Sequence, residues 1–90
     1  MGSHAYHHST AGETVKTGPG RLHEVHLAAG TDAATATVYD NTAASGTIIA
    51  RLAAVADGND RFAPKDGVGF GVGITIAFTG TSPTADFAYD

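Results

Sequence analysis

Histidine is the residue type in this chain best suited to metal or proton chemistry, and the 90 residues include five of them. His23 and His26 are three positions apart, a spacing that brings side chains together on a helix but separates them onto opposite faces of a strand. Residues 21–28 alternate like a strand, so we expect no shared metal ion there. The other three histidines are His4, His7 and His8, and no neighbouring residue in the sequence orients them. We expect these side chains either to form hydrogen bonds at an acid-sensitive contact or to be solvated.

Residues for nucleophilic catalysis are sparse. The chain has no Cys, and none of its serines stands in a Gly-x-Ser-x-Gly turn. Asp57, Asp60 and Asp66 lie near adjacent turns, where Asp is common, and they lack the spacing of a calcium loop. The alternating glycines of residues 69–73 run on into a strand pattern, whereas a nucleotide-binding motif needs a helix start. We therefore expect a protein that is not an enzyme and that needs no cofactor or metal.

The composition limits the fold that could position these groups. Ala, Gly and Thr make up 41 of the 90 residues, whereas Val, Ile, Leu and Phe number 17. One small domain with a thin core is expected, and a thin core favours burial against a partner or a second copy. The net charge is −4 and the five Lys and Arg are scattered, which argues against nucleic-acid binding. We see no membrane span, and no secretory signal in the first ten residues.

Alternation of large and small residues predicts an all-β fold. Turn signals rich in Gly, Pro, Asn and Asp separate the alternating segments, as in a small antiparallel β-sandwich or a jelly-roll-like barrel. A further strand is possible at residues 14–17. The six expected strands of the core are residues 21–28, 34–40, 47–55, 61–63, 68–79 and 84–90.

Two of these segments need a choice. Residues 47–55 also fit a helical stripe, but Ile48, Ala50 and Leu52 alternate and a turn-rich loop precedes them, so we predict a strand. Residues 68–79 place a large residue at every even position, which a helix would spread around its axis. We predict one continuous central strand there. Its bare face carries Gly69, Gly71 and Gly73, which would allow either a close subunit contact or strand curvature.

The N-terminal residues differ from the rest. Residues 1–20 hold only two large aliphatic side chains, Met1 and Val15, and end in Gly18-Pro19-Gly20, a strong breaker. Such a segment has too little apolar surface to fold alone. We expect an extended N-terminal arm over residues 1–20, held by the surface of another protein, and a β-sandwich domain over residues 21–90.

Three segments together resemble small β-proteins encoded among the virion genes of tailed phages and prophages. They are TGPGRLHEVHLAAG, VYDNTAASGTIIARL and VGFGVGITIAFTGTSPTADFAYD, and the resemblance covers roughly residues 17–90. These motifs are hairpin and turn signatures. The resemblance implies a non-enzymatic structural protein of the particle. Within that class, capsid decoration or cement proteins clamp neighbouring capsomers, commonly as trimers, and reach across with N-terminal arms.

The leading expectation is therefore a cement protein on a phage head, located in virions assembled in the host cytoplasm. Its partner would be the major capsid protein or another virion protein, and Gly69, Gly71 and Gly73 would form a subunit contact in a homo-oligomer. One alternative is a head-tail connector, tail or fibre component. Another is a carbohydrate-binding β-sandwich for host surfaces, which the lack of Trp and the presence of only three Tyr disfavour. The arm would contact the capsid through Tyr6, His7, His8 and Val15.

Overall fold

The computed structural model describes residues 5–90 and arranges them as strands and connecting turns, with no helix among them. Accordingly, no helix in this range could span a membrane. The all-β expectation is confirmed. The nine strands are β1 (Ala5–Ser9), β2 (Glu13–Thr17), β3 (Gly20–Ala28), β4 (Ala34–Asp40), β5 (Thr47–Ala54), β6 (Asn59–Phe62), β7 (Val68–Phe70), β8 (Gly73–Thr79) and β9 (Thr84–Tyr89).

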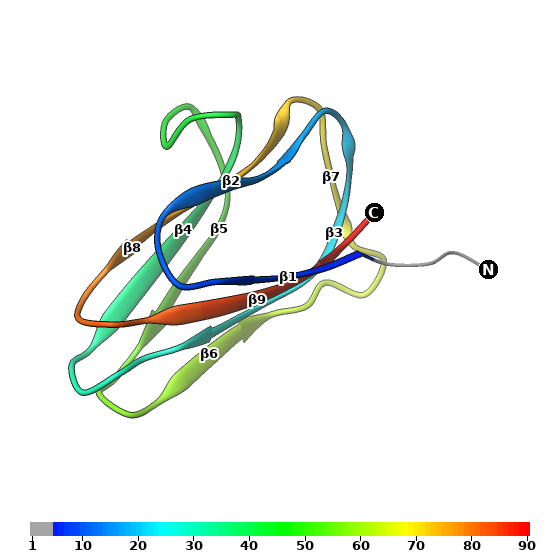
Figure 1. Cartoon of the computed structure of the whole chain (residues 1–90). Helices are drawn as coiled ribbons and strands as arrows, with labels where there is room; N and C mark the ends of the chain where they lie inside the picture. Colours follow the sequence, from blue (N-terminus) through cyan, green and yellow to red (C-terminus); the bar gives the residue numbers. More distant parts are fainter. Residues whose placement is uncertain (1–4) are drawn as a thin grey trace.

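The strands form two antiparallel sheets that face each other (Figure 1). Sheet A has the order β1-β9-β3-β6, and β7 pairs with the part of β3 that β6 leaves free. Sheet B has the order β2-β8-β4-β5. Only β4 and β5 form a hairpin within sheet B, so the chain passes repeatedly from one sheet to the other. The two-sheet antiparallel sandwich agrees with the predicted fold class.

The core lies between the sheets and is built from alternate residues of the inner strands. β5 is a strand as predicted, with Ala50 and Leu52 buried and Arg51 between them exposed. Ile48, expected on the same face as these two, is instead exposed, because the pairing of β4 with β5 shifts register between Val38 and Tyr39. Alanines fill several of the core positions, which is why few large side chains suffice. The largest fully buried apolar side chains are Phe87, Leu22, Leu27, Ile74, Ile76, Val25 and Val38.

Strand β3 departs from strict alternation. In a regular strand, where successive side chains point to opposite faces, Leu22 would lie on the face opposite Val25 and Leu27, yet all three are fully buried. The pairing of β3 with β9 shifts register between Leu22 and Glu24, so one extra residue is accommodated there. A β-bulge of this kind turns the residues before it over to the other face. The alternation expected for residues 21–28 therefore holds over residues 24–28 and fails at Leu22.

The predicted continuous strand over residues 68–79 is wrong. The chain bends at Gly71 and Val72, so β7 pairs in sheet A and β8 pairs in sheet B. The carboxylate of Asp40 stabilises the bend, since it accepts hydrogen bonds from the backbone amides of Gly71 and Val72 at 2.8–3.1 Å. Of the two explanations for the glycines, the structure therefore shows curvature at Gly71. The alternation of side chains is broken at the bend, because Phe70 and Ile74 are buried whereas Val72 between them is 50% exposed.

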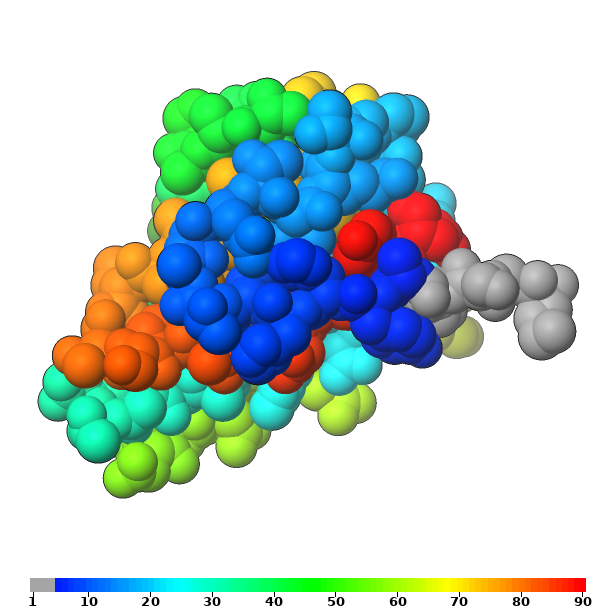
Figure 2. Space-filling model, viewed as in Figure 1, coloured from blue at the N-terminus to red at the C-terminus, as the bar shows by residue number. Residues whose placement is uncertain are grey.

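The N-terminal segment is part of the sandwich, which corrects the expectation of an extended arm held elsewhere. β1 pairs with β9 at the edge of sheet A, and β2, near the strand expected at residues 14–17, pairs with β8 at the edge of sheet B. In Figure 2 the blue N-terminal residues lie directly against the orange and red C-terminal residues. Backbone hydrogen bonds need no large side chains, so a polar segment can complete a sheet. Met1 and His4 lie outside the described residues.

Candidate functional site

The outer face of sheet A brings together several ionisable side chains that are far apart in the sequence. Register places four of them in one row across four neighbouring strands, in the order His8, Asp86, His26 and Arg61. An adjacent row runs from Tyr6 through Ala88 to Glu24. Directly opposite residues share a face of the sheet. Because their neighbours Phe87 and Val25 point into the core, both rows point outward.

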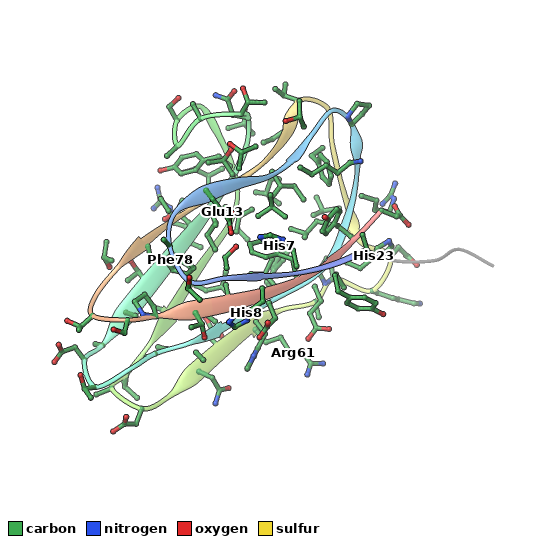
Figure 3. All side chains as sticks on the ribbon, in the orientation of Figure 1. His7, His8, Glu13, His23, Arg61 and Phe78 are labelled. Carbon is green, nitrogen blue, oxygen red and sulfur yellow. The ribbon has the colours of Figure 1, made fainter. Side chains whose placement is uncertain are left out.

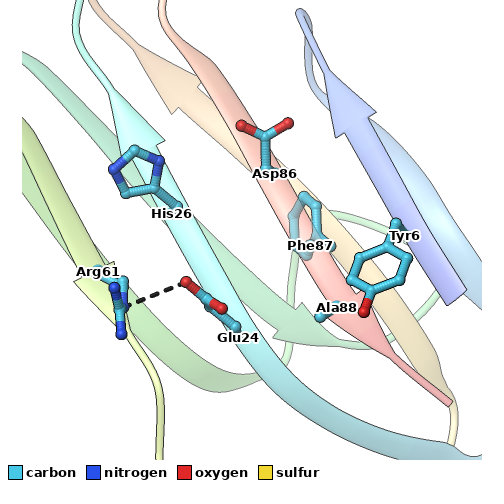
Figure 4. A pocket seen from close by; sticks show the side chains of 7 residues that line it. All are labelled: Tyr6, Glu24, His26, Arg61, Asp86, Phe87 and Ala88. Carbon is cyan, nitrogen blue, oxygen red and sulfur yellow. Dashed lines mark ion pairs between the residues drawn. The ribbon is translucent and has the colours of Figure 1, made fainter. Parts of the chain in front are cut away.

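A hollow of about 300 Å³ lies between these two rows. Ala88 contributes only a methyl group between Tyr6 and Glu24, so the centre of the surface is lower than its rim (Figure 4). Ala88 on β9 forms the floor, and the rim comes from β1, β3 and β6 together with Asp86 on β9. We call this site the sheet A hollow, and its lining residues are Tyr6, Glu24, His26, Arg61, Asp86, Phe87 and Ala88.

Two contacts between side chains lie at the rim of the sheet A hollow, an ion pair of Arg61 with Glu24 and a hydrogen bond between His8 and Asp86. Arg61 Nε lies 3.2 Å from Glu24 Oε2, and His8 Nδ1 lies 2.5 Å from Asp86 Oδ1. Each carboxylate thus keeps one oxygen that has no partner among residues 5–90. The imidazole of His26, which lies opposite Asp86 and Arg61, likewise forms no hydrogen bond or ion pair with another side chain in that range. The hollow therefore offers both donors and acceptors to a bound molecule.

The outer face of sheet B has a different chemistry. Thr35 lies between Ala53 and Thr79 in one row, and Thr37 lies between Arg51 and Ala77 in the next. Thr35 Oγ1 and Thr79 Oγ1 are 2.5 Å apart, so the hydroxyls also bond to one another. Arg51 is the only charged side chain of this surface. We call it the sheet B face and define it by Thr35, Thr37, Tyr39, Arg51, Ala53, Ala77 and Thr79.

Three carboxylates connect the two sheets. At one open side of the sandwich, Glu13 Oε2 accepts a hydrogen bond from Ser9 Oγ at 2.7 Å and lies 2.7 Å from His7 Nε2 (Figure 3). The hydrogen bonds from His7 and Ser9 lower the pKa of Glu13 below its usual value of 4.5. At the other open side, Asp60 on β6 accepts the amide of Ala53 on β5 at 3.1 Å. Each carboxylate thereby joins an edge strand of one sheet to the other sheet.

Asp40, the third carboxylate, lies at the end of β4. Its bonds to the amides of Val72 and Gly71 lower its pKa below the ordinary 3.8. The sequence places this residue in a turn-rich loop, and that position gives no indication of a contact 31 positions away. Residues such as Asp40 and Glu13 therefore stabilise the fold and are not free to bind a ligand.

The residues predicted to contact a partner are not on one surface. Tyr6 is 77% exposed and His8 points outward, where it pairs with Asp86. His7 is engaged by Glu13, and Val15 packs against the core. Partner binding by these four residues stays a prediction, but only Tyr6 and His8 are placed to take part from the outer face.

The predicted glycine contact is also divided by the bend. Gly69 is exposed on β7, Gly71 lies at the bend, and Gly73 is buried at the start of β8. A Cβ on Gly73 would come within 2.5 Å of the Lys16 carbonyl oxygen, so the close approach at that position is to the chain's own β2. A Cβ on Gly71 would meet nothing within 4 Å. A subunit contact through the three glycines stays a prediction, and they do not share one face.

No group of three or more His, Asp or Glu side chains that could hold a metal ion occurs among residues 5–90. Asp60, one of the three turn aspartates, is engaged with backbone amides of Ala53 and Arg61. No protein-family model, curated protein or solved structure matches the chain. The two outer surfaces are therefore the features of this all-β sandwich from which a function can be argued.

Proposed function

We propose that this protein is a non-enzymatic structural subunit of a tailed-phage virion that decorates the capsid and docks through the sheet B face. The observation that carries the proposal is the composition of that face: small side chains, hydroxyls that bond to one another, and one charged residue, Arg51. The resemblance of the sequence to virion β-proteins supports the same class.

The sheet B face suits contact with a protein surface for two physical reasons. Thr and Ala have few rotamers, so little side-chain entropy is lost when they are covered. A surface with one cation requires little desolvation of charge, which otherwise offsets much of the attraction across an interface. Tyr39 at one end of the face adds an aromatic side chain of the kind enriched in interfaces.

Docking by a rigid face replaces clamping by an arm, because β1 and β2 are already paired within the sandwich. Contacts of modest strength then suffice, since a capsid presents the same site many times and can bind many copies. A head-tail connector, tail or fibre component would use the same kind of contact in far fewer copies. Copy number therefore separates the two virion positions.

Binding to virions assembled without the protein tests this proposal. We expect the purified full chain to occupy such particles at hundreds of copies, whereas about a dozen copies would indicate a connector. Thr37→Lys adds a second cation beside Arg51 on the sheet B face and should reduce occupancy at least tenfold. Asn59→Lys places the same charge on the outer face of sheet A, as a matched control. Wild-type occupancy by Thr37→Lys, or no binding by the full chain, would overturn the proposal.

A further inference from the structure

We propose that the sheet A hollow binds a pyranose sugar, with the ring of Tyr6 as its stacking platform. This inference goes beyond the proposed function and concerns the opposite surface of the sandwich. It combines an exposed aromatic ring, a small depression and a rim of hydrogen-bonding groups held on four paired strands.

Among residues 5–90, Tyr6 is the most exposed of the large apolar side chains, with 77% of its surface accessible. The other two tyrosines, Tyr39 and Tyr89, are half-buried. The main chain of Tyr6 is paired with Ala88, whose methyl group leaves the face toward the hollow open (Figure 4). An aromatic ring beside a depression can cover the apolar C–H face of a sugar ring, and this contact removes apolar surface from water.

The rim supplies the hydrogen bonds that sugar hydroxyls require. Arg61 uses Nε for Glu24, so its terminal nitrogens have no partner among residues 5–90 and can donate. The second oxygens of Glu24 and Asp86 can accept, and the His26 imidazole can do either. A hydroxyl both donates and accepts, so neighbouring hydroxyls of a pyranose can be shared between a carboxylate and a guanidinium.

Other ligand classes fit this hollow less well. Glu24 and Asp86 would repel a phosphate or a nucleotide, and the part of the chain that the structure describes has no group of three or more metal-ligating side chains to hold a cation. A purely apolar ligand would leave the charged rim without partners and desolvated. A neutral sugar can stack its C–H face on the ring of Tyr6 and form hydrogen bonds with the charged groups of the rim. The volume of about 300 Å³ is at the small end of ligand sites, which suits one or two sugar units.

The hollow is largely preformed. Its residues stand on β1, β9, β3 and β6, and the pairing of these four strands fixes the backbone around the hollow before a ligand arrives. Preorganisation reduces the entropy lost on binding. With a dozen non-hydrogen atoms and an open site, one sugar unit should bind with a Kd on the order of 1 mM. Many copies on one particle would raise the apparent affinity for a polysaccharide.

Nuclear magnetic resonance titration of the full chain tests the proposal. The probes are methyl glucopyranoside, methyl mannopyranoside and N-acetylglucosamine, followed by an immobilised oligosaccharide array that separates free sugars from surface glycans as the source. We expect amide shifts confined to the residues around Tyr6, Glu24, His26 and Asp86. Absence of binding to every probe and to the array, or shifts centred on Tyr39, would overturn the proposal.

Three variants separate the parts of the site. Tyr6→Ala should weaken binding at least tenfold, and Tyr6→Phe, which keeps the ring, should weaken it less than threefold. Tyr39→Ala on the sheet B face is the matched control and should bind the sugar like the wild type. Equal losses in Tyr6→Ala and Tyr6→Phe would contradict stacking. Tyr6 and the sheet B face lie on opposite surfaces of the sandwich. Loss of sugar binding should therefore leave the occupancy on virions unchanged, so that each proposal can be rejected without the other.

Discussion

The outer faces of the two sheets follow the same antiparallel pairing and nevertheless present opposite chemistry. Sheet A exposes a row of charged and imidazole side chains from His8 to Arg61, around a hollow. Sheet B exposes Thr and Ala with one cation, Arg51. Both faces share one core, so the residues that point inward can satisfy the fold while those that point outward vary independently. One small sandwich thereby has room for two different binding surfaces.

The faces also differ in how they depend on the N-terminal segment. The sheet A hollow takes Tyr6 from β1, which is an edge strand held at its inner side by the contact of His7 with Glu13. The sheet B face lies on β4, β5 and β8, and needs no residue of β1 or β2. Changes near the N-terminus should therefore disturb the sugar site more than the docking face. The following predictions test this asymmetry and the shared core.

Removal of residues 1–18 should have the largest effect. It deletes one edge strand of each sheet and uncovers the core beneath Val15, so we expect loss of cooperative unfolding for the whole domain. Circular dichroism during heating would measure this, with the full chain as reference. A shortened chain that unfolds like the full chain would restore the interpretation of this segment as an arm.

Asp40→Ala should have the next largest effect. It removes the acceptor for the amides of Val72 and Gly71, and the loss of hydrogen bonds to a charged group should lower the free energy of unfolding by about 2 kcal/mol. Because the lost hydrogen bonds lie where β4 meets the bend, we expect the variant to bind virions more weakly through the sheet B face. Sugar binding at the sheet A hollow should be unchanged. Asp66→Asn, which changes a turn carboxylate to a neutral amide, is the control. Urea denaturation checks the stability.

Because Asp40 titrates, the difference in stability between the wild type and Asp40→Ala should depend on pH. Folding lowers the pKa of this carboxyl below 3.8, so the unfolded chain takes up the proton first as the pH falls. The stabilisation is complete above the unfolded value and is lost as the pH falls through the folded one. The wild type should therefore lose more stability than Asp40→Ala between neutral pH and pH values below 3.8. Parallel losses in both proteins would show that the carboxylate does not support the bend.

Glu13→Gln should have the smallest effect on stability, about 1 kcal/mol, because Gln keeps an acceptor for Ser9 and the side chain is partly exposed. The same sign holds as for Asp40, since folding lowers the pKa of Glu13 below 4.5. We expect faster hydrogen exchange at the amides of β1 and β2, unchanged exchange at β4 and β5, and weaker sugar binding. Asp32→Asn in an exposed turn is the control, and uniform exchange across both sheets would contradict the asymmetry.

Part of the candidate site was readable from the sequence. Alternation placed Glu24 and His26 on one side of their strand, and Phe87 with Tyr89 on one side of the last strand. It could not show that Tyr6, Asp86, His26 and Arg61 would meet. The bulge at Leu22 and the bend at Gly71 were also not predicted. The bulge depends on pairing with β9, and the bend depends on the carboxylate of Asp40, which is distant in the sequence.

The sequence by itself determined the all-β class, most strand positions, the turns between them and the apolar side of those strands that have no bulge or bend. These follow from local sterics and from the two-residue period of side chains. Only the tertiary structure decided which strands are neighbours, that residues 5–17 complete both sheets, and that a hollow lies over Ala88. The reason is that strands pair through backbone N–H and C=O groups, which nearly all residues have. The order of side chains along the sequence therefore says little about which strands pair.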